Sequence, residues 1–277
     1  MSESELPRKS IRTGDYNTNF IESGAGEPLI LIHGAGPGAD ARGNWKGSLP
    51  LFAAAGFRAM AYDMVGFGDS DAPDPARFDY GQNARFQQLL AFLDALGLES
   101  ANIVGNSMGG ATALGVAMRH PERLRKLVLM GSAGLSNPQP SPALMALAQY
   151  DFTVAGMKKV VEALTHPDFA APPELISYRH ALSMRPQLQA AFKALLDAGA
   201  ARTGGGMYQD EDVARCKVET LVVNGKDDKV VPMSQGYRFI QLLENSTGYF
   251  IPHCGHWAMI ERPRLFADVT SSFLKRS

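Results

Sequence analysis

The hydrophobic pattern of the chain alternates between short apolar runs and longer stretches with helical spacing. Leu29–Ile32 is a continuous apolar run, as expected of a strand buried on both faces of a parallel sheet. Between 80 and 96, leucine and phenylalanine recur at helical spacing. Further strands are expected at Tyr16–Glu22, Phe57–Tyr62, a run ending at Val104, Lys126–Met130, Thr220–Val223 and Gly248–Ile251. Strands that alternate with helices predict an α/β fold, with helices on both faces of a mostly parallel central sheet.

The pattern changes after Gly134. Several prolines follow between 136 and 142, and 144–212 has helical patterns without a convincing strand until Gly204–Gly206 ends the region. Strand-like runs resume at Thr220. We therefore expect a core domain in two parts, 1–135 and 213–277, with 136–212 inserted as a helical lid above the sheet.

Composition narrows the possible partners and the setting of the protein. The 277 residues are 45% hydrophobic, and 27 basic against 28 acidic side chains give a formal charge of −1. This balance argues against nucleic acid or an anionic membrane surface as the main partner. No apolar run approaches the ~18 residues of a membrane span, and the polar N-terminus is unlike a secretory signal. Cys216 and Cys254 make no disulfide framework, and no zinc-type spacing occurs, so we expect a cytoplasmic protein without a metal.

The candidate chemistry begins at Gly105-Asn106-Ser107-Met108-Gly109. An apolar strand precedes this Gly-x-Ser-x-Gly and a helical pattern follows it. That context predicts a nucleophile elbow, a turn so tight that Gly105 and Gly109 must lack side chains while Ser107 stands at the tip. A serine hydroxyl is a poor nucleophile unless a base removes its proton and a third group orients that base.

The chain order Ser107, Asp228, His256 is that of acyl-transfer enzymes with this architecture. His256 is predicted to accept the proton of Ser107, and Asp228 to orient the imidazole. Asp227 and His253 are the alternatives to the last two residues. All three predicted residues and the glycine-rich loop 33–38 follow strands directly, so they are expected to meet at one edge of the sheet, beneath the inserted helices. The backbone N–H groups of Ala35 and Met108 would form the oxyanion hole, and no cofactor is needed.

The residues are also similar to those of a known family. The chain resembles the meta-cleavage product hydrolases, which are carbon–carbon bond hydrolases of the α/β-hydrolase fold in bacterial degradation of aromatic compounds. Asparagine before the nucleophile and Cys-Gly-His-Trp around the base are more specific than the elbow itself. The resemblance covers nearly the whole chain and is carried by His33–Ala39, Gly105–Ala113, Leu129–Gly134, Gly225–Pro232 and His253–Ala258.

The resemblance implies a 2-hydroxy-6-oxo-hexa-2,4-dienoate substrate with a 6-aryl or 6-alkyl group, cleaved to 2-hydroxypenta-2,4-dienoate and a carboxylic acid. Arg179 aligns with the family's carboxylate-binding arginine, whose fork can hold a carboxylate in two hydrogen bonds. Gly36, Asn44, Asn106 and Trp257 are implied to line the dienoate end. Ala35 is a departure, because relatives often have glycine there. A homo-oligomer, dimeric or larger, is also implied.

Two other functions fit parts of the pattern. An ordinary carboxylesterase would share the triad and oxyanion hole but would need neither Asn106 nor Arg179. A non-catalytic ligand receptor of this fold is disfavoured because all three triad positions are filled. The 6-substituent is not fixed by the sequence, and the apolar candidates for contacting it are Phe152, Met157, Met184 and Met207.

Overall fold

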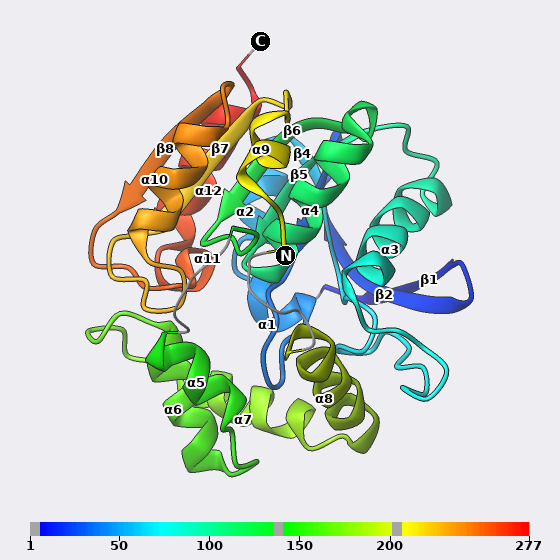
Figure 1. Cartoon of the computed structure of the whole chain (residues 1–277), viewed down its shortest axis with the longest axis vertical. Coiled ribbons are helices and arrows are strands. Elements are labelled where there is room, and N and C mark those ends of the chain that lie inside the picture. Colours follow the sequence, from blue (N-terminus) through cyan, green and yellow to red (C-terminus); the bar gives the residue numbers. More distant parts are fainter. Residues whose placement is uncertain (1–5, 136–140, 201–206, 277) are drawn as a thin grey trace.

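A computed structural model describes residues 6–135, 141–200 and 207–276, and it places one eight-stranded sheet at the centre (Figure 1). The strand order is β1-β2-β4-β3-β5-β6-β7-β8. β1 and β2 run antiparallel to their neighbours, and all later pairs are parallel. The expected α/β fold is confirmed. The strands are β1 (Arg8–Thr13), β2 (Tyr16–Ser23), β3 (Glu27–Ile32), β4 (Phe57–Tyr62), β5 (Ala101–Asn106), β6 (Leu124–Met130), β7 (Thr220–Gly225) and β8 (Ser246–Ile251).

Helices cover both faces of the sheet, because the inner strands are apolar on both sides. In β3, Leu29 and Leu31 pack into one apolar cluster, whereas Ile30 and Ile32 pack into another on the opposite face. The first cluster is closed by α1 (Ala41–Trp45), α2 (Leu49–Ala54), α11 (Ala258–Glu261) and α12 (Pro263–Leu274). The second is closed by α3 (Gln82–Ala95), α4 (Met108–Arg119) and α10 (Met233–Leu242), with the short 3-10 helix η2 (Pro121–Arg123) after α4.

The segment between β6 and β7 is helical, as expected. It contains α5 (Pro142–Ala148), α6 (Val154–Leu164), α7 (Pro173–Ser183), α8 (Pro186–Ala200) and α9 (Asp210–Ala214). Helices α5–α8 gather at one end of the molecule, beyond the strands, whereas α9 lies against the main body (Figure 1). The backbone N–H of Tyr208 donates to Gly134 O at 3.0 Å, and its hydroxyl donates to Ala111 O at 2.5 Å.

These contacts attach the end of the insertion to the core before the expected boundary at 212. The expected start at 136 and the Gly204–Gly206 segment lie outside the described residues. We propose that the lid consists of α5–α8, and that the second part of the core begins before Tyr208. No helix in the described ranges is both long and apolar enough to cross a membrane.

Candidate active site

The elbow forms where β5 passes directly into α4. Ser107 lies between them with φ 54° and ψ −117°, a left-handed conformation that costs a non-glycine residue on the order of 1–3 kcal/mol. Hydrogen bonds on both sides hold it there. Its N–H donates to Met130 O at 3.1 Å, and its carbonyl accepts from the N–H groups of Ala111 and Ala133, each at 3.1 Å. Ser107 is half-buried, while its neighbours in β5 and α4 are buried.

The two elbow glycines have no room for a side chain. A Cβ on Gly105 would lie 2.4 Å from Gly109 O, and one on Gly109 would lie 2.5 Å from the carbonyl oxygens of Ile32 and His33. Real Cβ atoms essentially never approach that closely. The prediction that these two residues must be glycine is therefore confirmed.

An acid–base pair lies at the ends of β7 and β8. His256 Nδ1 is 2.8 Å from Asp228 Oδ2, and the relative exposures of these residues are 4% and 6%. The other carboxylate oxygen, Oδ1, accepts from Val230 N at 2.8 Å and Val231 N at 2.9 Å. With Asp228 Oδ2 accepting from Nδ1–H, Nε2 is left as the basic nitrogen of the imidazole.

The elbow and the acid–base pair meet beside the end of β6. A Cβ on Gly131 would lie 3.0 Å from both His256 Nδ1 and Asp228 Oδ2, and Gly131 directly follows Met130, the acceptor for Ser107 N–H. Asn106 bridges the same point, since its Nδ2 donates to Met130 O at 3.1 Å and to His256 O at 3.5 Å. All three predicted catalytic residues thus lie at one edge of the sheet.

The alternatives to the acid and the base point elsewhere. Asp227 has a 43% exposed side chain, and its carboxylate lies 3.7 Å from His166 Nε2. The ring of His253 packs edge-on against the ring of His166, with centroids 5.7 Å apart. Cys254 is buried, and burial raises the pKa of its thiol. The geometry therefore favours Asp228 and His256.

The glycine-rich loop lies directly over the elbow. A Cβ on Gly34 would be 3.0 Å from Ser107 Cβ. His33 fixes the start of this loop, because its Nδ1 contacts Gly34 O at 2.8 Å and its Nε2 accepts from Met64 N at 3.0 Å. Burial lowers the pKa of His33 to about 4, which keeps the ring neutral and able to make both bonds. The half-buried Ala35 follows Gly34 in this loop, and Met108 begins α4 directly after Ser107. Free N–H groups at such a helix start suit an oxyanion.

Arg179 on α7 is buried with two unpartnered nitrogens. It is 1% exposed, and Nη2 donates to Pro37 O at 3.1 Å. Its Nε and Nη1 have no hydrogen-bond partner among the described residues. Its guanidinium lies over the ring of Trp257, 4.6 Å from the centroid, and a Cβ on Gly36 would be 3.6 Å from Nη2. Burial lowers the pKa of Arg179 to about 10, which leaves it charged at neutral pH.

A buried polar network adjoins Arg179 on α7. Tyr178 donates a short hydrogen bond to Asp40, and Arg8 Nη2 donates to Tyr178 Oη at 2.9 Å. Asp40 also caps α1 by accepting from Gly43 N at 2.6 Å. Asp63 lies in the same network, where burial and the charge of Asp40 raise its pKa to about 7. No pattern in the sequence predicted this network.

The remaining predicted binding residues differ in their surroundings. Asn44 is buried on α1, where its Nδ2 donates to Asp40 O at 2.6 Å, and it borders an outer groove between α1, α7 and α11. Among the substituent candidates, Met157 is fully buried in an apolar cluster, whereas Met184 is 46% exposed. Met207 is partly buried against the other cluster.

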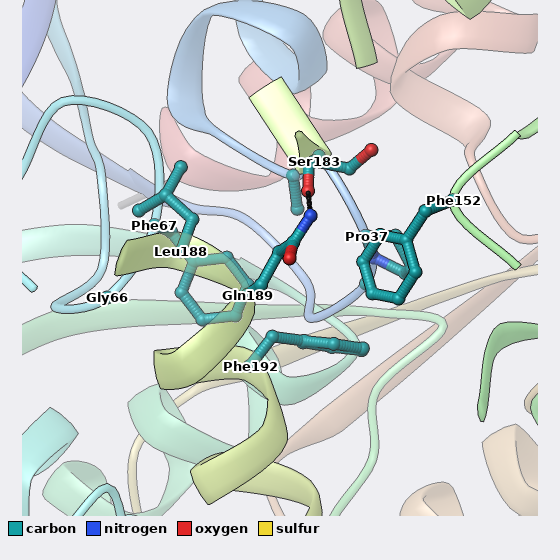
Figure 2. A pocket seen from close by; sticks show the side chains of 11 residues that line it. Pro37, Gly66, Phe67, Phe152, Ser183, Leu188, Gln189 and Phe192 are labelled. Carbon is teal, nitrogen blue, oxygen red and sulfur yellow. Dashed lines mark hydrogen bonds between the residues drawn. The ribbon is translucent and has the colours of Figure 1, made fainter. Parts of the chain in front are cut away.

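Phe152, the remaining candidate, lines a small pocket beside the glycine-rich loop (Figure 2). Leu188 and Phe192 of α8 face it, and Gln189 Nε2 donates to Ser183 O at 3.0 Å across its rim. The pocket joins the loop next to Pro37, whose carbonyl holds Arg179. Within the described ranges, no three His, Cys, Asp or Glu side chains are grouped so that they could hold a metal ion.

Comparison with known proteins places this geometry in a family. The alpha/beta hydrolase fold family matches residues 27–263. A 2-hydroxy-6-oxo-6-(2'-aminophenyl)hexa-2,4-dienoic acid hydrolase from Metapseudomonas resinovorans is 43% identical over 99% of this chain and 93% of its own length. The chain belongs to the meta-cleavage product hydrolases of the alpha/beta hydrolase fold.

Other meta-cleavage product hydrolases give the same picture. A 2-hydroxy-6-oxo-2,4-heptadienoate hydrolase from Pseudomonas putida is 36% identical over 96% of this chain and 95% of its own length. Among solved structures, a serine hydrolase involved in carbazole degradation is 42% identical, with a TM-score of 0.88 over 97% of this chain and 98% of that one. A carboxylesterase from Bacillus subtilis is 20% identical at a TM-score of 0.76, which shows the shared fold alone.

Proposed function

We propose that the chain hydrolyses a carbon–carbon bond of a 2-hydroxy-6-oxo-hexa-2,4-dienoate in the breakdown of aromatic compounds, giving 2-hydroxypenta-2,4-dienoate and a carboxylic acid. One observation carries this proposal. A buried, charged Arg179 presents two unpartnered N–H-bearing nitrogens near a serine elbow and its acid–base pair. Such a group is costly to bury unless an anion completes it, and a dienoate carboxylate is an anion of suitable shape.

The reaction needs both the carboxylate site and the triad. With the carboxylate on Arg179, the dienol first becomes its keto tautomer, because the departing fragment must leave as a stabilised enolate. His256 Nε2 takes the proton of Ser107 as its Oγ attacks the carbonyl at C6. The N–H groups of Ala35 and Met108 bind the resulting oxyanion. The C5–C6 bond then breaks, and its electron pair passes into the enolate, which takes the proton that His256 received from Ser107.

Water completes the cycle. The acyl group remains on Ser107 after the first product leaves, and His256 then removes a proton from water as the water attacks the acyl carbon. Asp228 stabilises the imidazolium in both halves. Gly36, Asn106 and Trp257 are proposed to surround the dienoate end, because they adjoin Arg179 or the elbow. Asn44 is also proposed to line the dienoate end, because the family resemblance implies it.

The first experiment replaces Ser107 with alanine and follows a single turnover by absorbance. We expect Ser107→Ala to bind the coloured dienoate and to leave it uncleaved, while Ser177→Ala, a serine on the exposed side of α7, cleaves normally. Complete cleavage by Ser107→Ala would remove the proposed nucleophile. Steady-state rates on 6-phenyl and 6-alkyl dienoates then identify the substituent.

A carboxylesterase is the second candidate, favoured only by the triad that both functions share. The ratio of the rates on a dienoate and on a neutral nitrophenyl ester separates them, because an esterase gains nothing from Arg179. A receptor would bind the dienoate tightly without turnover. We further propose a cytoplasmic location and a homo-oligomer, which size-exclusion chromatography with light scattering would test.

A further inference from the structure

Glu261 is a carboxylate outside the acid–base pair that binds the backbone around His256. At the end of α11, its Oε1 accepts from Gly255 N and from Trp257 N, each at 3.1 Å. Its Oε2 accepts from Gly255 N at 2.9 Å and from His166 N at 2.8 Å. Two of these three donors are the residues immediately before and after His256. The carboxylate therefore spans the residue that carries the base.

The loop that Glu261 holds is also bound through two of its carbonyl oxygens, since Arg262 Nη2 donates to His253 O and Asp227 N donates to Cys254 O, each at 3.0 Å. It follows β8 as irregular backbone and begins at His253 with a left-handed φ of 51°. His256 N itself donates to Leu164 O at 2.8 Å, at the end of α6. A Cβ on Gly255 would lie 2.7 Å from the carbonyl carbon of Thr165, so the two segments pass in direct contact. The hydrogen bond from His166 N–H to Glu261 also joins the segment after α6 to the end of α11.

The chemistry of the contact requires a carboxylate. Both oxygens accept hydrogen bonds, and every donor is a backbone N–H, which cannot reverse its role. A glutamine has one accepting oxygen, and its amide nitrogen would face a backbone N–H, donor against donor. An aspartate is one methylene shorter and would not span the three donors.

We propose that Glu261 is a positioning residue, which fixes the His256 loop against the end of α6 so that the imidazole faces Asp228 on one side and Ser107 on the other. The proposal rests on the triad of the proposed function but not on the dienoate as its substrate. Glu261 also holds Trp257, whose ring lies under the Arg179 guanidinium. One carboxylate would thus position both the catalytic base, His256, and the Trp257 ring beside the proposed anion site.

The test measures how fast a fluorophosphonate labels Ser107, since this reagent needs an activated serine and carries no carboxylate for Arg179. Its phosphorus is attacked by Ser107 Oγ, and fluoride leaves. In Glu261→Gln we expect the maximal labelling rate to fall between about 10- and 100-fold, the effect of a misplaced base, with the half-saturating concentration unchanged. Asp168→Asn is the matched control, because its 88% exposed carboxylate lies in the same cleft without touching the His256 loop.

Glu261→Ala adds a rescue experiment. Glu261 borders a surface cleft lined also by Phe169 and Arg262, so truncation opens a path by which formate can reach the backbone donors. We expect formate to accelerate labelling of Glu261→Ala and to leave the wild type and Glu261→Gln unchanged. Thermal melting of each variant separates misplacement from unfolding, and Glu261→Gln, the isosteric change, decides the matter if the alanine variant does not fold.

Several outcomes overturn the proposal. A folded Glu261→Gln that is labelled at the wild-type rate removes the positioning role. Equal slowing in Asp168→Asn would show that the charge of the cleft, not the three bonds, controls the rate. A wild type that is labelled at Ser107 but cleaves no dienoate refutes the substrate assignment alone, whereas an unlabelled wild type refutes both proposals.

Discussion

Replacing Arg179 with methionine should weaken dienoate binding on the order of 100-fold or more and leave the stability of the free protein almost unchanged. Methionine keeps much of the buried apolar volume of the arginine stem but removes its charge and its donors. Arg179 is 1% exposed, with two nitrogens unpartnered. Replacing a residue that binds the ligand lowers affinity but not stability, whereas replacing a residue that supports the fold lowers stability but not affinity.

The stability term comes from three contributions. Burial lowers the pKa of Arg179 from 12.5 to about 10, which at about 1.4 kcal/mol per pKa unit costs the free protein about 3 kcal/mol. The hydrogen bond to Pro37 O returns about 1–2 kcal/mol, and the contact with the Trp257 ring returns about 1–2 kcal/mol. These terms nearly cancel. We expect the free energy of unfolding of Arg179→Met to lie within about 1 kcal/mol of the wild type, whereas truncating a buried side chain usually costs about 2–5 kcal/mol.

The loss of binding free energy in Arg179→Met has no compensating contribution. Two hydrogen bonds to a charged group are worth at least about 3 kcal/mol, so the Kd for the dienoate should rise on the order of 100-fold or more. Absorbance titration in a Ser107→Ala background measures the Kd, and urea unfolding measures stability. Arg185→Met is the control, because that arginine is 42% exposed and pairs with Asp69 at 2.6 Å. Loss of more than about 3 kcal/mol of stability with an unchanged Kd would show that Arg179 serves the fold.

Three further predictions follow from single contacts. Burial raises the pKa of Asp63 to about 7, so the folded state binds a proton there that the unfolded state loses above about pH 4. The free energy of unfolding should therefore fall by as much as about 4 kcal/mol as pH rises from about 4 to 7. Asp63→Asn should remove that pH dependence in urea unfolding. Gly131 has a φ of 47°, and Gly131→Ala places a Cβ 3.0 Å from His256 Nδ1, so kcat should fall about 10- to 100-fold. Gly47→Ala is the control, because its added Cβ meets nothing within 4 Å and kcat should not change. Tyr178→Phe removes one of the hydrogen-bond donors to buried Asp40 and should cost about 1–3 kcal/mol in urea unfolding. Tyr237→Phe, at a 50% exposed tyrosine, should cost nothing measurable.

The parts of the fold that could be predicted are those in which burial dictates composition. Strands β3 and β4 lie inside the sheet, and their apolar runs identified them to within two residues. β1 was missed because it is an edge strand, and its sequence Arg8–Thr13 is polar except for Ile11, with only Thr13 buried, so that it resembles a polar tail. Its pairing with β2 is made through the backbone, which the side-chain pattern does not report.

Some residues of the site could likewise be predicted from the sequence, and others could not. The elbow, the acid and the base could be predicted because each needs a particular residue type just after a strand. The choice of Asp228 over Asp227 could not come from the residues, since both acids occupy one turn, and only burial separates a 0% exposed side chain from a 43% exposed one. Glu261 gave no signal, because its three donors are backbone groups that any sequence would supply.

Three unfavourable local features lie at the proposed site. Ser107 holds a left-handed backbone, Arg179 is a buried cation with unpartnered donors, and Asn106 Oδ1 is buried without a partner. Stability alone does not favour any of the three, because strained backbone and unpartnered buried polar atoms carry a free-energy cost. Hydrogen bonds from Ser107 N–H to Met130 O and from Gly255 N–H to Glu261 hold the elbow and the His256 loop in place. A bound dienoate that satisfied Arg179 would remove one of these costs, so ligand binding should raise the melting temperature of the wild type and leave that of Arg179→Met unchanged.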